Sequence, residues 1–441
     1  MNIPEYAVRA IKQLEKNGFE AYLVGGCVRD FIMGIEPHDF DITTNAMPEQ
    51  IKSVFSEYKT ISSGEKHGTE AIVIDGNLVE ITTYRTESGY TDNRHPDAVH
   101  FSSCLEEDLR RRDFTMNAIA MDINGALTDP FNGQQDIVGR VIRTVGDAGE
   151  RFSEDALRIL RALRFSSMFG FEIESSTSGA ILENAQLLKN ISAERIRDEF
   201  EGILCGRVPD NILRKYREVI AVFIPEIRKC FDFEQHTPYH KYDVWEHIIH
   251  AVKYSKNTKK IRTAMFFHDI SKPECYKQDE NGQGHFKRHA QKSAVRAKEI
   301  MKRLRFPNSF TSDVTRLIYH HSDELNSRYE IKRLMGEIGV ENTLDLIDVQ
   351  RADSMSKQEF CRERLKKSDD QEKIIREIAD NNECISLNQL DISGFDIVKL
   401  GVSGRNIGEI LNKLLDEVMR EEVKNDKKEL IYYAKLLIKY L

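Results

Sequence analysis

The spacing of apolar residues changes once along this chain, near residue 145. Before that point, short runs alternate apolar and polar residues, which is the pattern of half-buried strands, and turn residues separate the runs. The expected strands are residues 71–74, 78–84, 99–101 and 119–123, and the expected turns are 75–77 and 124–125. Residues 1–145 are therefore predicted to form an α+β head in which short strands mix with helices.

Beyond about residue 153, apolar residues recur every three or four positions, as on one face of a helix. Residues 156–165 are the clearest case, and strand patterns almost vanish after them. Turn-rich segments at 124–149 and 231–242 indicate boundaries. The expected domains are a head at 1–145, a helical neck at 146–235, a helical body at 236–365 and a helical tail at 366–441.

The composition narrows the class of protein. With 441 residues, 31% charged and 40% hydrophobic, the chain has the length of roughly two to four domains and the balance of a soluble protein. Its apolar runs are too short to span a membrane, and Glu5 and Glu15 do not fit a signal peptide. Its seven cysteines form no C-x-x-C pair. We expect a cytoplasmic protein with no membrane partner and no disulfide framework.

The net charge of −8 disfavours a nucleic-acid partner on average, because phosphate contacts need Lys and Arg. Residues 287–305 are nevertheless strongly basic, with Glu299 as their single acid. This segment is either an RNA-contacting face or a solvated helix surface, and its sequence favours neither interpretation.

Two glycines and two aspartates carry the first chemical signal. Gly25 and Gly26 follow an apolar run and precede a helical one, so the backbone there can approach a triphosphate, and Arg29 lies one turn further on. Asp39 and Asp41 are separated by one apolar residue, so on a strand both would point to the same face. Adjacent carboxylates repel unless cations lie between them. The pattern predicts a two-metal, Mg²⁺-dependent nucleotidyl-transfer site.

A second polar cluster occupies residues 106–118 and contains three arginines. A nucleotide site would place Arg112 on a phosphate, and Asp113 or Asn117 on sugar hydroxyls. The alternative is a capped surface helix with ion pairs.

A third cluster places Arg158, Arg161 and Arg164 along one inclined row of a helix. We expect Ser153 to be the N-cap of that helix, with Asp155 in its first turn. A carboxylate at Asp155 beside the Arg158 guanidinium accepts cytosine and adenine, which present an amino donor next to a ring-nitrogen acceptor. Uracil and guanine would leave buried polar groups unpaired. The pair predicts selectivity for CTP and ATP without a nucleic-acid template.

Five motifs in this order resemble those of class II tRNA nucleotidyltransferases, the CCA-adding enzymes of the polymerase-β-like superfamily. The resemblance covers residues from about 20 to 205, and the motifs are residues 25–30 with 39–41, 111–118, 136–143, 154–158 and 194–199. It implies a polymerase-β-like nucleotidyltransferase head. It also implies attack of the tRNA 3′-hydroxyl on the α-phosphate of CTP or ATP, with release of pyrophosphate. No DNA partner is expected.

The same resemblance implies site residues. Asp39 and Asp41 would be catalytic and bind Mg²⁺, and Glu80 could be a third acid. The nucleotide-binding residues would be Gly26, Arg29, Arg112, Asp113, Asn117, Asp155, Arg158, Arg161 and Arg164.

Related activities remain open. Relatives that add only CC lack a flexible loop, which here, at residues 85–96, has full length. Relatives that add only A are not excluded. Bacterial poly(A) polymerases typically carry a long basic tail, whereas residues 424–433 are mixed in charge. Residues 400–408 resemble the start of the tRNA-gripping tail of class II enzymes, or form a packing element.

Residues 265–273 resemble the signature of HD-domain phosphohydrolases, although Ser271 replaces a frequent glycine. That resemblance implies a second divalent metal held by His247, His268, Asp269 and Asp353, with His289 and one of His320 or His321 completing a two-metal site. Its substrates would be phosphate esters at RNA ends or small nucleotides. Any one of these histidines could instead be an ordinary core residue.

The leading hypothesis is therefore a CCA-adding enzyme with an appended HD domain. The rivals are a phosphohydrolase with a degenerate head and an RNA-binding factor without turnover. The sequence leaves the oligomeric state open.

Overall fold

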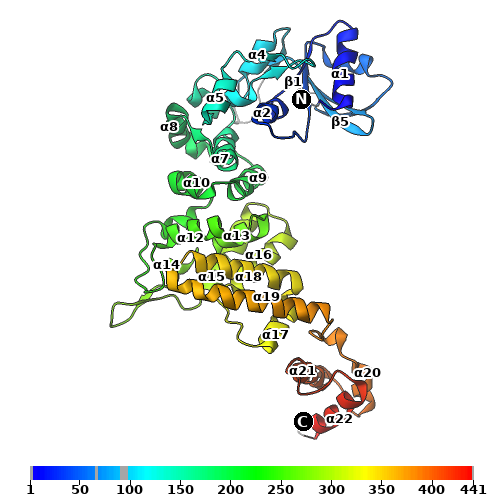
Figure 1. Ribbon diagram of the computed structural model, residues 1–441, viewed down its shortest axis with the longest axis vertical. Coiled ribbons are helices and arrows are strands. Elements are labelled where there is room, and N and C mark those ends of the chain that lie inside the picture. Colours follow the sequence, from blue (N-terminus) through cyan, green and yellow to red (C-terminus); the bar gives the residue numbers. More distant parts are fainter. Residues whose placement is uncertain (1–2, 65–67, 90–97, 440–441) are drawn as a thin grey trace. The chain divides into compact units, whose positions relative to one another are not determined.

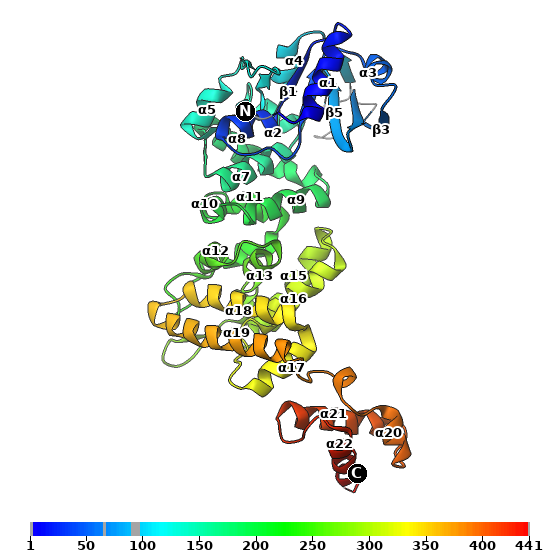
Figure 2. The same cartoon turned by 45° about the vertical axis from the view of Figure 1, so that its right-hand side comes forward.

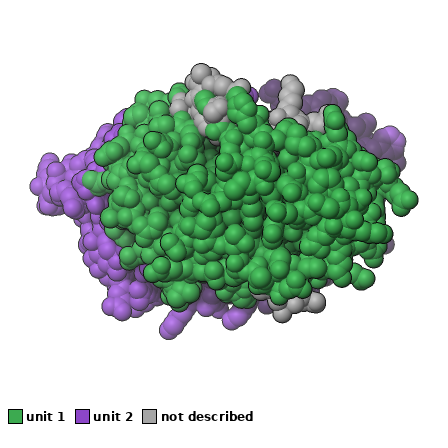
Figure 3. All heavy atoms as spheres, turned by 90° about the horizontal axis from the view of Figure 1, so that it is seen from above, with its two compact units in different colours: residues 1–225 green, residues 226–441 purple. Residues whose placement is uncertain are grey.

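The computed structural model describes residues 3–64, 68–89 and 98–439. The chain divides into two compact units, Met1–Pro225 and Glu226–Leu441, which Figure 3 shows in different colours. The α+β fold class with a helical continuation is confirmed. The finer division into head, neck, body and tail stays a prediction.

The first unit, which contains the labelled strands β1 and β5 of Figure 1, is built on a seven-stranded mixed sheet. The strand order of this sheet is β3-β4-β5-β2-β1-β8-β9. Its strands are β1 (Ala21–Val24), β2 (Asp41–Thr44), β3 (Lys59–Gly64), β4 (Thr69–Ile74), β5 (Asn77–Thr83), β8 (Ala120–Met121) and β9 (Leu127–Thr128). Strand β2 pairs antiparallel with β1 and parallel with β5. The four expected strands are all present, and the turn between β4 and β5 consists of Asp75 and Gly76. Both residues have positive φ (52° and 81°), as a two-residue hairpin requires.

Separate short pairs lie beside this sheet. They are β6 (Arg85–Ser88) with β7 (Ala98–Phe101), and β10 (Val141–Ile142) with β11 (Glu172–Ile173). Most of the loop expected at residues 85–96 lies outside the described residues, because 90–97 are not part of them.

The helices of the first unit alternate with these strands and then continue alone. They are α1 (Glu5–Lys16), α2 (Gly26–Met33), α3 (Pro48–Val54), α4 (Leu105–Arg110), η2 (Thr115–Asn117), α5 (Gly133–Gly139), α6 (Ala148–Glu154), α7 (Leu157–Phe169), α8 (Ser175–Asn184), η3 (Ala185–Asn190), α9 (Ala193–Leu204), α10 (Pro209–Lys215) and α11 (Arg217–Phe223).

Helix α7 carries the arginine row and packs closely on α9. The Ser167 hydroxyl donates to the Ile203 carbonyl oxygen at 2.7 Å. A Cβ atom on Gly202 would lie 2.4 Å from Cδ of Arg164, and one on Gly206 would lie 2.1 Å from Oγ of Ser167. Glycine at these two positions therefore permits the close approach that fixes the arginine row.

The expected N-cap at Ser153 is wrong. Ser153 lies in the last turn of α6, and its hydroxyl donates to the Gly149 carbonyl oxygen. The chain breaks at Asp155, whose backbone is extended, before α7 begins at Leu157. Asp155 accepts a hydrogen bond from the Leu157 N–H at 3.0 Å. The Asp155 carboxylate therefore satisfies a backbone N–H at the start of α7, which is the role that was expected of Ser153.

The segment η4 (Pro225–Cys230) leads into the second unit, which is helical as expected except for the short pair β12 (Lys277–Gln278) and β13 (Gly284–His285) (Figure 2). Its helices are α12 (Val244–Tyr254), α13 (Lys259–Phe267), α14 (Lys272–Cys275), α15 (His289–Arg303), α16 (Asn308–His320), α17 (Arg328–Ile338), α18 (Val340–Met355), η5 (Glu359–Glu363), α19 (Arg364–Asp380), η6 (Leu387–Gln389), α20 (Gly394–Lys399), α21 (Arg405–Met419) and α22 (Lys427–Ile438).

The last three helices share a small core that includes Ile397, Ile410, Leu414 and Leu430. Nowhere in the described part of the chain is a helix both long and apolar enough to cross a membrane.

Candidate active sites

The sharp turn between β1 and α2 forms one wall of a polar pocket in the first unit. Gly25 caps α2 with a φ of 77°, a conformation that favours glycine. A Cβ atom on Gly25 would lie 3.1 Å from Nη1 of Arg112 and 4.0 Å from Oδ2 of Asp41. The glycine turn therefore lies directly against one predicted metal ligand and one predicted phosphate ligand.

The pocket has a volume of about 320 Å³, within the range of small-molecule sites. It brings together groups from four separated segments of the chain. Its lining consists of Gly25, Gly26, Arg29, Asp41, Arg111, Arg112, Asp113, Asn117, Asp155, Arg158, Arg161 and Phe165. Nearly all of the predicted nucleotide-binding residues thus meet in one place. Asp39 and Arg164 are not among the lining residues.

Three acids gather at the start of strand β2. Asp41 is its first residue, and the parallel pairing with β5 places Glu80 opposite it. Partial burial raises the pKa of Asp41, and the charge of Glu80 raises it further. The raised pKa means that the ionised form of Asp41 is disfavoured, and a bound cation would stabilise it. Carboxylate oxygens are suitable ligands for a hard divalent ion. The donor set therefore fits the metal that the sequence predicts.

Asp39 lies two residues before β2 begins, so the expectation that both aspartates belong to one strand is wrong. The alternation nevertheless continues through this segment. Phe40 is buried and packs against Tyr6 and Phe31, with ring centroids 6.0 and 5.8 Å away. Asp39 and Asp41 on either side of it are both more accessible to solvent than Phe40.

Protein acids and amides already position the pocket arginines. Nη1 of Arg29 donates to Oδ1 of Asn117 at 2.9 Å, and its guanidinium lies 5.2 Å from the Phe165 ring centroid. Nη2 of Arg112 donates to Oδ2 of Asp108 at 3.2 Å. Because these partners fix the guanidinium planes, little side-chain freedom is lost when an anion binds.

Asp108 is a buried residue whose role the sequence did not reveal. Its carboxylate pairs with Arg111 and Arg112, and it accepts a hydrogen bond from the Thr43 hydroxyl at 3.1 Å. Thr43 lies on β2, two residues after Asp41. Asp108 thus ties the strand of the acids to the arginines across the pocket. The sequence offered one signal for this role: Asp108 lies three and four residues before Arg111 and Arg112, a spacing at which side chains of a helix can pair.

Asp113 is held in its ionised form. Its Oδ2 accepts from Nε of Arg161 at 2.8 Å, and its Oδ1 accepts from Nδ2 of Asn117 at 3.0 Å. Burial by itself would raise the pKa of Asp113, but Arg161 and Asn117 outweigh burial and lower the pKa to about 2.

Asp155 and Arg158 line the same pocket but have different protein partners. Asp155 pairs with Arg195 at 3.1 Å, whereas Arg158 pairs with Glu154 at 2.7 Å and donates to the Arg111 carbonyl oxygen. Arg164 is directed toward α9, where its Nε donates to Oε2 of Glu199 at 2.6 Å. The expectation that all three arginines of the row reach a nucleotide stays a prediction for Arg164.

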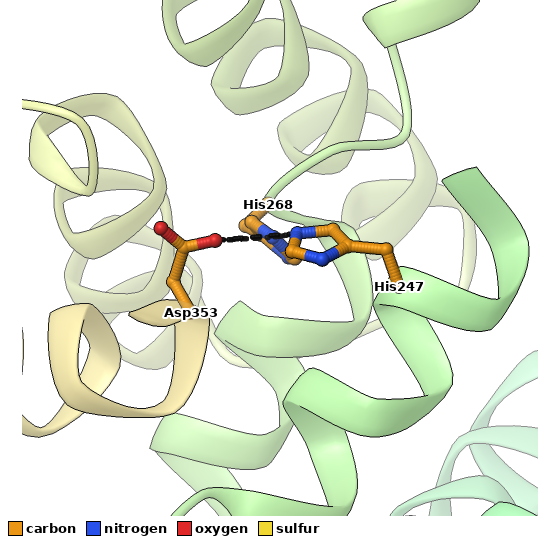
Figure 4. Close-up of side chains that lie close together, drawn as sticks. All are labelled: His247, His268 and Asp353. Atoms are coloured by element: carbon orange, nitrogen blue, oxygen red, sulfur yellow. Dashed lines mark hydrogen bonds and ion pairs between the residues drawn. The ribbon is translucent and has the colours of Figure 1, made fainter. Parts of the chain in front are cut away.

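A second centre lies in the helical unit, where His247 of α12, His268 at the end of α13, and Asp353 of α18 converge (Figure 4). Nε2 of His247 lies 3.1 Å from Nε2 of His268 and 3.2 Å from Oδ1 of Asp353. Asp269 also lies there, with Oδ2 3.1 Å from Nε2 of both histidines. The four predicted core ligands are therefore adjacent and buried.

Backbone carbonyls fix the tautomers of the histidines in this centre. Nδ1–H of His268 donates to the Met265 carbonyl oxygen at 2.7 Å, and His289 and His321 donate in the same way to Phe286 and Ile318. A carbonyl oxygen can only accept, so each Nδ1 carries a hydrogen and each Nε2 is the ring atom directed to the centre.

His247 reaches the same state through a hydroxyl group. The Ser356 hydroxyl donates to the Asp353 carbonyl oxygen at 2.7 Å, so its oxygen accepts from Nδ1–H of His247 at 3.1 Å. Such outer partners are typical of metal-binding histidines.

The centre requires a positive charge. Burial by itself lowers the pKa of His268, but Asp269 and Asp353 outweigh burial and raise the pKa to about 9. Either a proton on His268 or a divalent cation can supply this charge. Imidazole nitrogens and carboxylate oxygens are suitable ligands for a transition metal, so the residues fit the group that the sequence implies.

His289 and His321 extend the centre on the far side of Asp269. Their Nε2 atoms lie 3.2 Å from each other, and 3.3 and 3.7 Å from Oδ1 of Asp269. The choice between His320 and His321 is resolved by geometry, because the His320 ring pairs instead with Asp323 and Glu337. A pocket of about 460 Å³ opens onto this centre.

The basic segment at residues 287–305 largely forms α15. Two of its cations have protein partners in this unit, since Arg296 pairs with Glu274 and Arg303 pairs with Glu226. An RNA-contacting role for the segment stays a prediction.

Three protein-family models match the chain. They are the poly A polymerase head domain at residues 21–143, the probable RNA and SrmB- binding site of polymerase A at residues 170–230, and the HD domain at residues 239–358.

Curated relatives match over the first half of the chain. The CCA-adding enzyme of Geobacillus thermodenitrificans (strain NG80-2) is 51% identical over 222 residues, which are 50% of this chain and 54% of that protein. The CCA-adding enzyme of Lactobacillus helveticus (strain DPC 4571) is 51% identical over 201 residues, or 45% and 50% of the two chains. The chain thus spans about half the length of the curated relatives it matches.

Solved structures match over the whole length. The Bacillus stearothermophilus CCA-adding enzyme in complex with CTP has a TM-score of 0.75 and 29% identity, covering 100% of this chain and 99% of that chain. The Thermotoga maritima CCA-adding enzyme complexed with tRNA has a TM-score of 0.59 at 21% identity, covering 98% and 94%, and shows a shared fold. By its head domain, its HD domain and these relatives, the chain is similar to the CCA-adding enzymes.

Proposed function

We propose that this protein adds CMP, CMP and AMP to the 3′ end of tRNA from CTP and ATP, without a nucleic-acid template. One observation carries the proposal: Asp155 and Arg158 line the same pocket as the Gly25–Gly26 turn and Asp41. A group able to select bases thus lies beside groups able to hold a triphosphate and a metal. The two curated relatives, which are 51% identical to this chain over the matched residues, are named as CCA-adding enzymes.

In the proposed reaction, the 3′ oxygen of the RNA forms a bond to the α-phosphorus. The bond from that phosphorus to its bridging oxygen breaks, and pyrophosphate leaves. Members of this family typically use divalent metals, and we propose Mg²⁺ held by Asp39 and Asp41, with Glu80 beside them. Such ions stabilise the attacking and leaving oxygens.

The remaining pocket residues orient the nucleotide. Arg29 and Arg112 face the glycine turn, where the backbone admits phosphates, and we assign them to the triphosphate. Asp113 and Asn117 are assigned to the sugar. Arg161 keeps Asp113 ionised, so that carboxylate accepts hydrogen bonds from hydroxyl groups at neutral pH.

Base selection is assigned to Asp155 and Arg158. Asp155 accepts from the amino group of cytosine or adenine, and Arg158 donates to the neighbouring ring nitrogen. A uracil or guanine edge would oppose acceptor to acceptor, and leaving buried polar groups unpaired gives strong discrimination.

Three tRNA transcripts test the proposal. They lack the whole CCA end, only CA, or only the final A, and each is incubated with labelled CTP or ATP and Mg²⁺. We expect all three to be completed to CCA. Extension of only the third transcript, by ATP, would make the protein an A-adding enzyme, and long adenylate tails on unrelated RNA would make it a poly(A) polymerase.

We further propose that the HD centre hydrolyses a phosphate ester at an RNA end. The supporting observation is the set of four imidazole Nε2 atoms that face Asp269 and Asp353. In this reaction water attacks the phosphorus and the ester P–O bond breaks. RNA ending in a 2′,3′-cyclic phosphate, incubated with each of several divalent ions, should open to a monoester. An unchanged cyclic end with every ion would contradict this second proposal.

We expect both activities to operate in the cytoplasm, and we assign residues 1–145 to the nucleotidyltransferase head, 146–235 to the neck, 236–365 to the HD body and 366–441 to a tRNA-binding tail.

A further inference from the structure

The pocket that opens onto the HD centre is larger than a reacting phosphate needs. Its volume of about 460 Å³ is that of a site for a small ligand such as a nucleotide. The lining extends from Asp269 and Asp353 at the centre to residues of α19, Arg364 and Lys367 among them. The part of the pocket beyond the metal ligands therefore has room for the remainder of a substrate.

The cations of this pocket fall into two groups. Lys272 and Lys357 pair with the acids of the centre, since Nζ of Lys272 lies 2.6 Å from Oδ2 of Asp269 and Lys357 pairs with Asp353. These lysines belong to the reacting end. Arg364 is exposed and makes no ion pair with any residue that the structure describes, and Lys367 donates only to the neutral amide of Asn326, at 2.5 Å.

Arg364 and Lys367 are therefore free to bind a second anion, away from the reacting phosphate. Asp323 and Glu324 carry the opposing charge on the facing part of the lining, so the anion would lie on the α19 side. Arginine suits a phosphate because its guanidinium can donate two parallel hydrogen bonds.

An aromatic pair borders the same pocket. Tyr239, which lines it, and Phe360 of η5 have ring centroids 6.0 Å apart and are 47% and 56% exposed. Their segments are far apart in sequence, but the Gln358 N–H donates to the Tyr239 carbonyl oxygen at 2.9 Å and holds them together. Exposed aromatic rings at a polar pocket are suited to stacking a nucleobase.

We propose that this pocket binds the terminal nucleotide of an RNA 3′ end at three points. Its 3′ phosphate lies at the HD centre, its base stacks on Tyr239, and its 5′ phosphate, which links it to the preceding nucleotide, contacts Arg364 and Lys367. The pocket thus distinguishes an RNA end from a simple phosphate ester. The inference rests on the phosphohydrolase proposal for the nature of the reacting group, but its test depends on binding alone.

The probes are adenosine 3′,5′-bisphosphate, adenosine 3′-monophosphate and inorganic phosphate, titrated calorimetrically into the full chain with and without a divalent ion. Arg364→Ala should weaken the binding of the bisphosphate by about tenfold, because a charge-assisted hydrogen bond is lost. The affinity for the monophosphate should stay within about twofold of that of the unchanged protein. Tyr239→Ala should weaken both nucleotides and leave inorganic phosphate unchanged.

Matched controls separate these effects from general damage. Arg362→Ala removes a neighbouring surface arginine that pairs only weakly with Glu359, and Tyr319→Ala removes an exposed tyrosine outside the pocket. Neither should change any affinity. Binding in the head pocket is common to all variants, so the differences between variants report this site.

Two results would overturn the inference: unchanged bisphosphate binding by Arg364→Ala, or equal losses for bisphosphate and monophosphate. Selective loss of bisphosphate binding in a protein that hydrolyses no ester would support this nucleotide site while refuting the hydrolytic proposal.

Discussion

The two centres of this protein differ in how their charged groups are paired. In the head pocket, each arginine already has a protein partner: Arg112 pairs with Asp108, Arg158 with Glu154 and Arg161 with Asp113. In the HD centre, imidazole Nε2 atoms lie against two buried carboxylates, which also pair with Lys272 and Lys357. The arginines of the head pocket are thus each held by an acid, whereas the histidines and acids of the HD centre form a donor set that suits an ion.

This difference predicts how substitutions in each centre should affect stability and ligand binding. Removing one head residue leaves a charged partner unpaired inside the protein, which affects stability as well as activity. Removing one HD histidine leaves no lysine or acid of the centre without its partner, so it should mainly affect metal affinity.

The largest effect on activity should come from Asp41→Ala. Without this ligand the metal site beside Glu80 fails, and nucleotide incorporation should fall by more than about a hundredfold, since even outer partners of metal ligands cost 10–100-fold. Incorporation of labelled CTP and ATP into tRNA measures it. Glu49→Ala, an exposed acid of the same unit, should be as active as the unchanged protein. Normal incorporation by Asp41→Ala would contradict the assignment.

The HD centre offers a matched pair of adjacent histidines. His321→Ala should weaken the binding of a divalent ion by about 10–100-fold, whereas His320→Ala should leave the affinity unchanged, because its ring is directed to Asp323. Equilibrium dialysis with metal analysis distinguishes the two. Equal losses in both variants would show that the geometry of Asp269 and His321 is not that of a metal site.

Asp108→Ala should have the largest effect on stability. It removes one partner of two buried arginine pairs, which typically costs about 3–5 kcal/mol of unfolding free energy. Glu106→Ala, on the same helix α4, removes a surface pair with Arg110 and should cost less than about 1 kcal/mol. Urea unfolding of the two variants compares them. If both lose the same small amount, Asp108 does not tie β2 to the arginines.

A smaller, pH-dependent effect is expected for Asp113→Asn. The folded protein lowers the pKa of Asp113 to about 2, so its charge stabilises the fold above the pKa of the unfolded chain, near 4. The difference from the unchanged protein should be about 2 kcal/mol at pH 7 and should shrink as the pH falls from about 5 to about 2. Thermal unfolding across this range measures it; a difference independent of pH would argue against the Arg161 pairing.

Local motifs were predictable from sequence because their chemistry depends on residues close together in the chain. The Gly25–Gly26 turn required no tertiary information, since the φ of 77° at Gly25 is a local property. Within the HD set, His268 and Asp269 belong to the local signature at residues 265–273, whereas the other members were expected only from the resemblance to HD-domain phosphohydrolases. Ser153 was assigned wrongly because several polar residues compete to end or begin a helix there, and only packing decides which one does.

The unpredicted contacts are the long-range ones. Glu199 pairs with Arg164 from another helix, and Arg195 pairs with Asp155 across 40 positions of sequence. No spacing rule connects such residues, because their separation is set by how α7 and α9 pack.

The sequence by itself determined the kinds of chemistry in this protein: a glycine turn with two aspartates, an arginine row, and histidines with acids. These follow from residue type and local spacing, which the covalent chain fixes. Only the tertiary structure decided which groups meet. It placed Glu80 beside Asp41 through parallel strand pairing, chose His321 over its neighbour, and directed Arg164 away from the pocket. Strand register and helix packing depend on contacts between distant segments, and these contacts decide which side chains share a site.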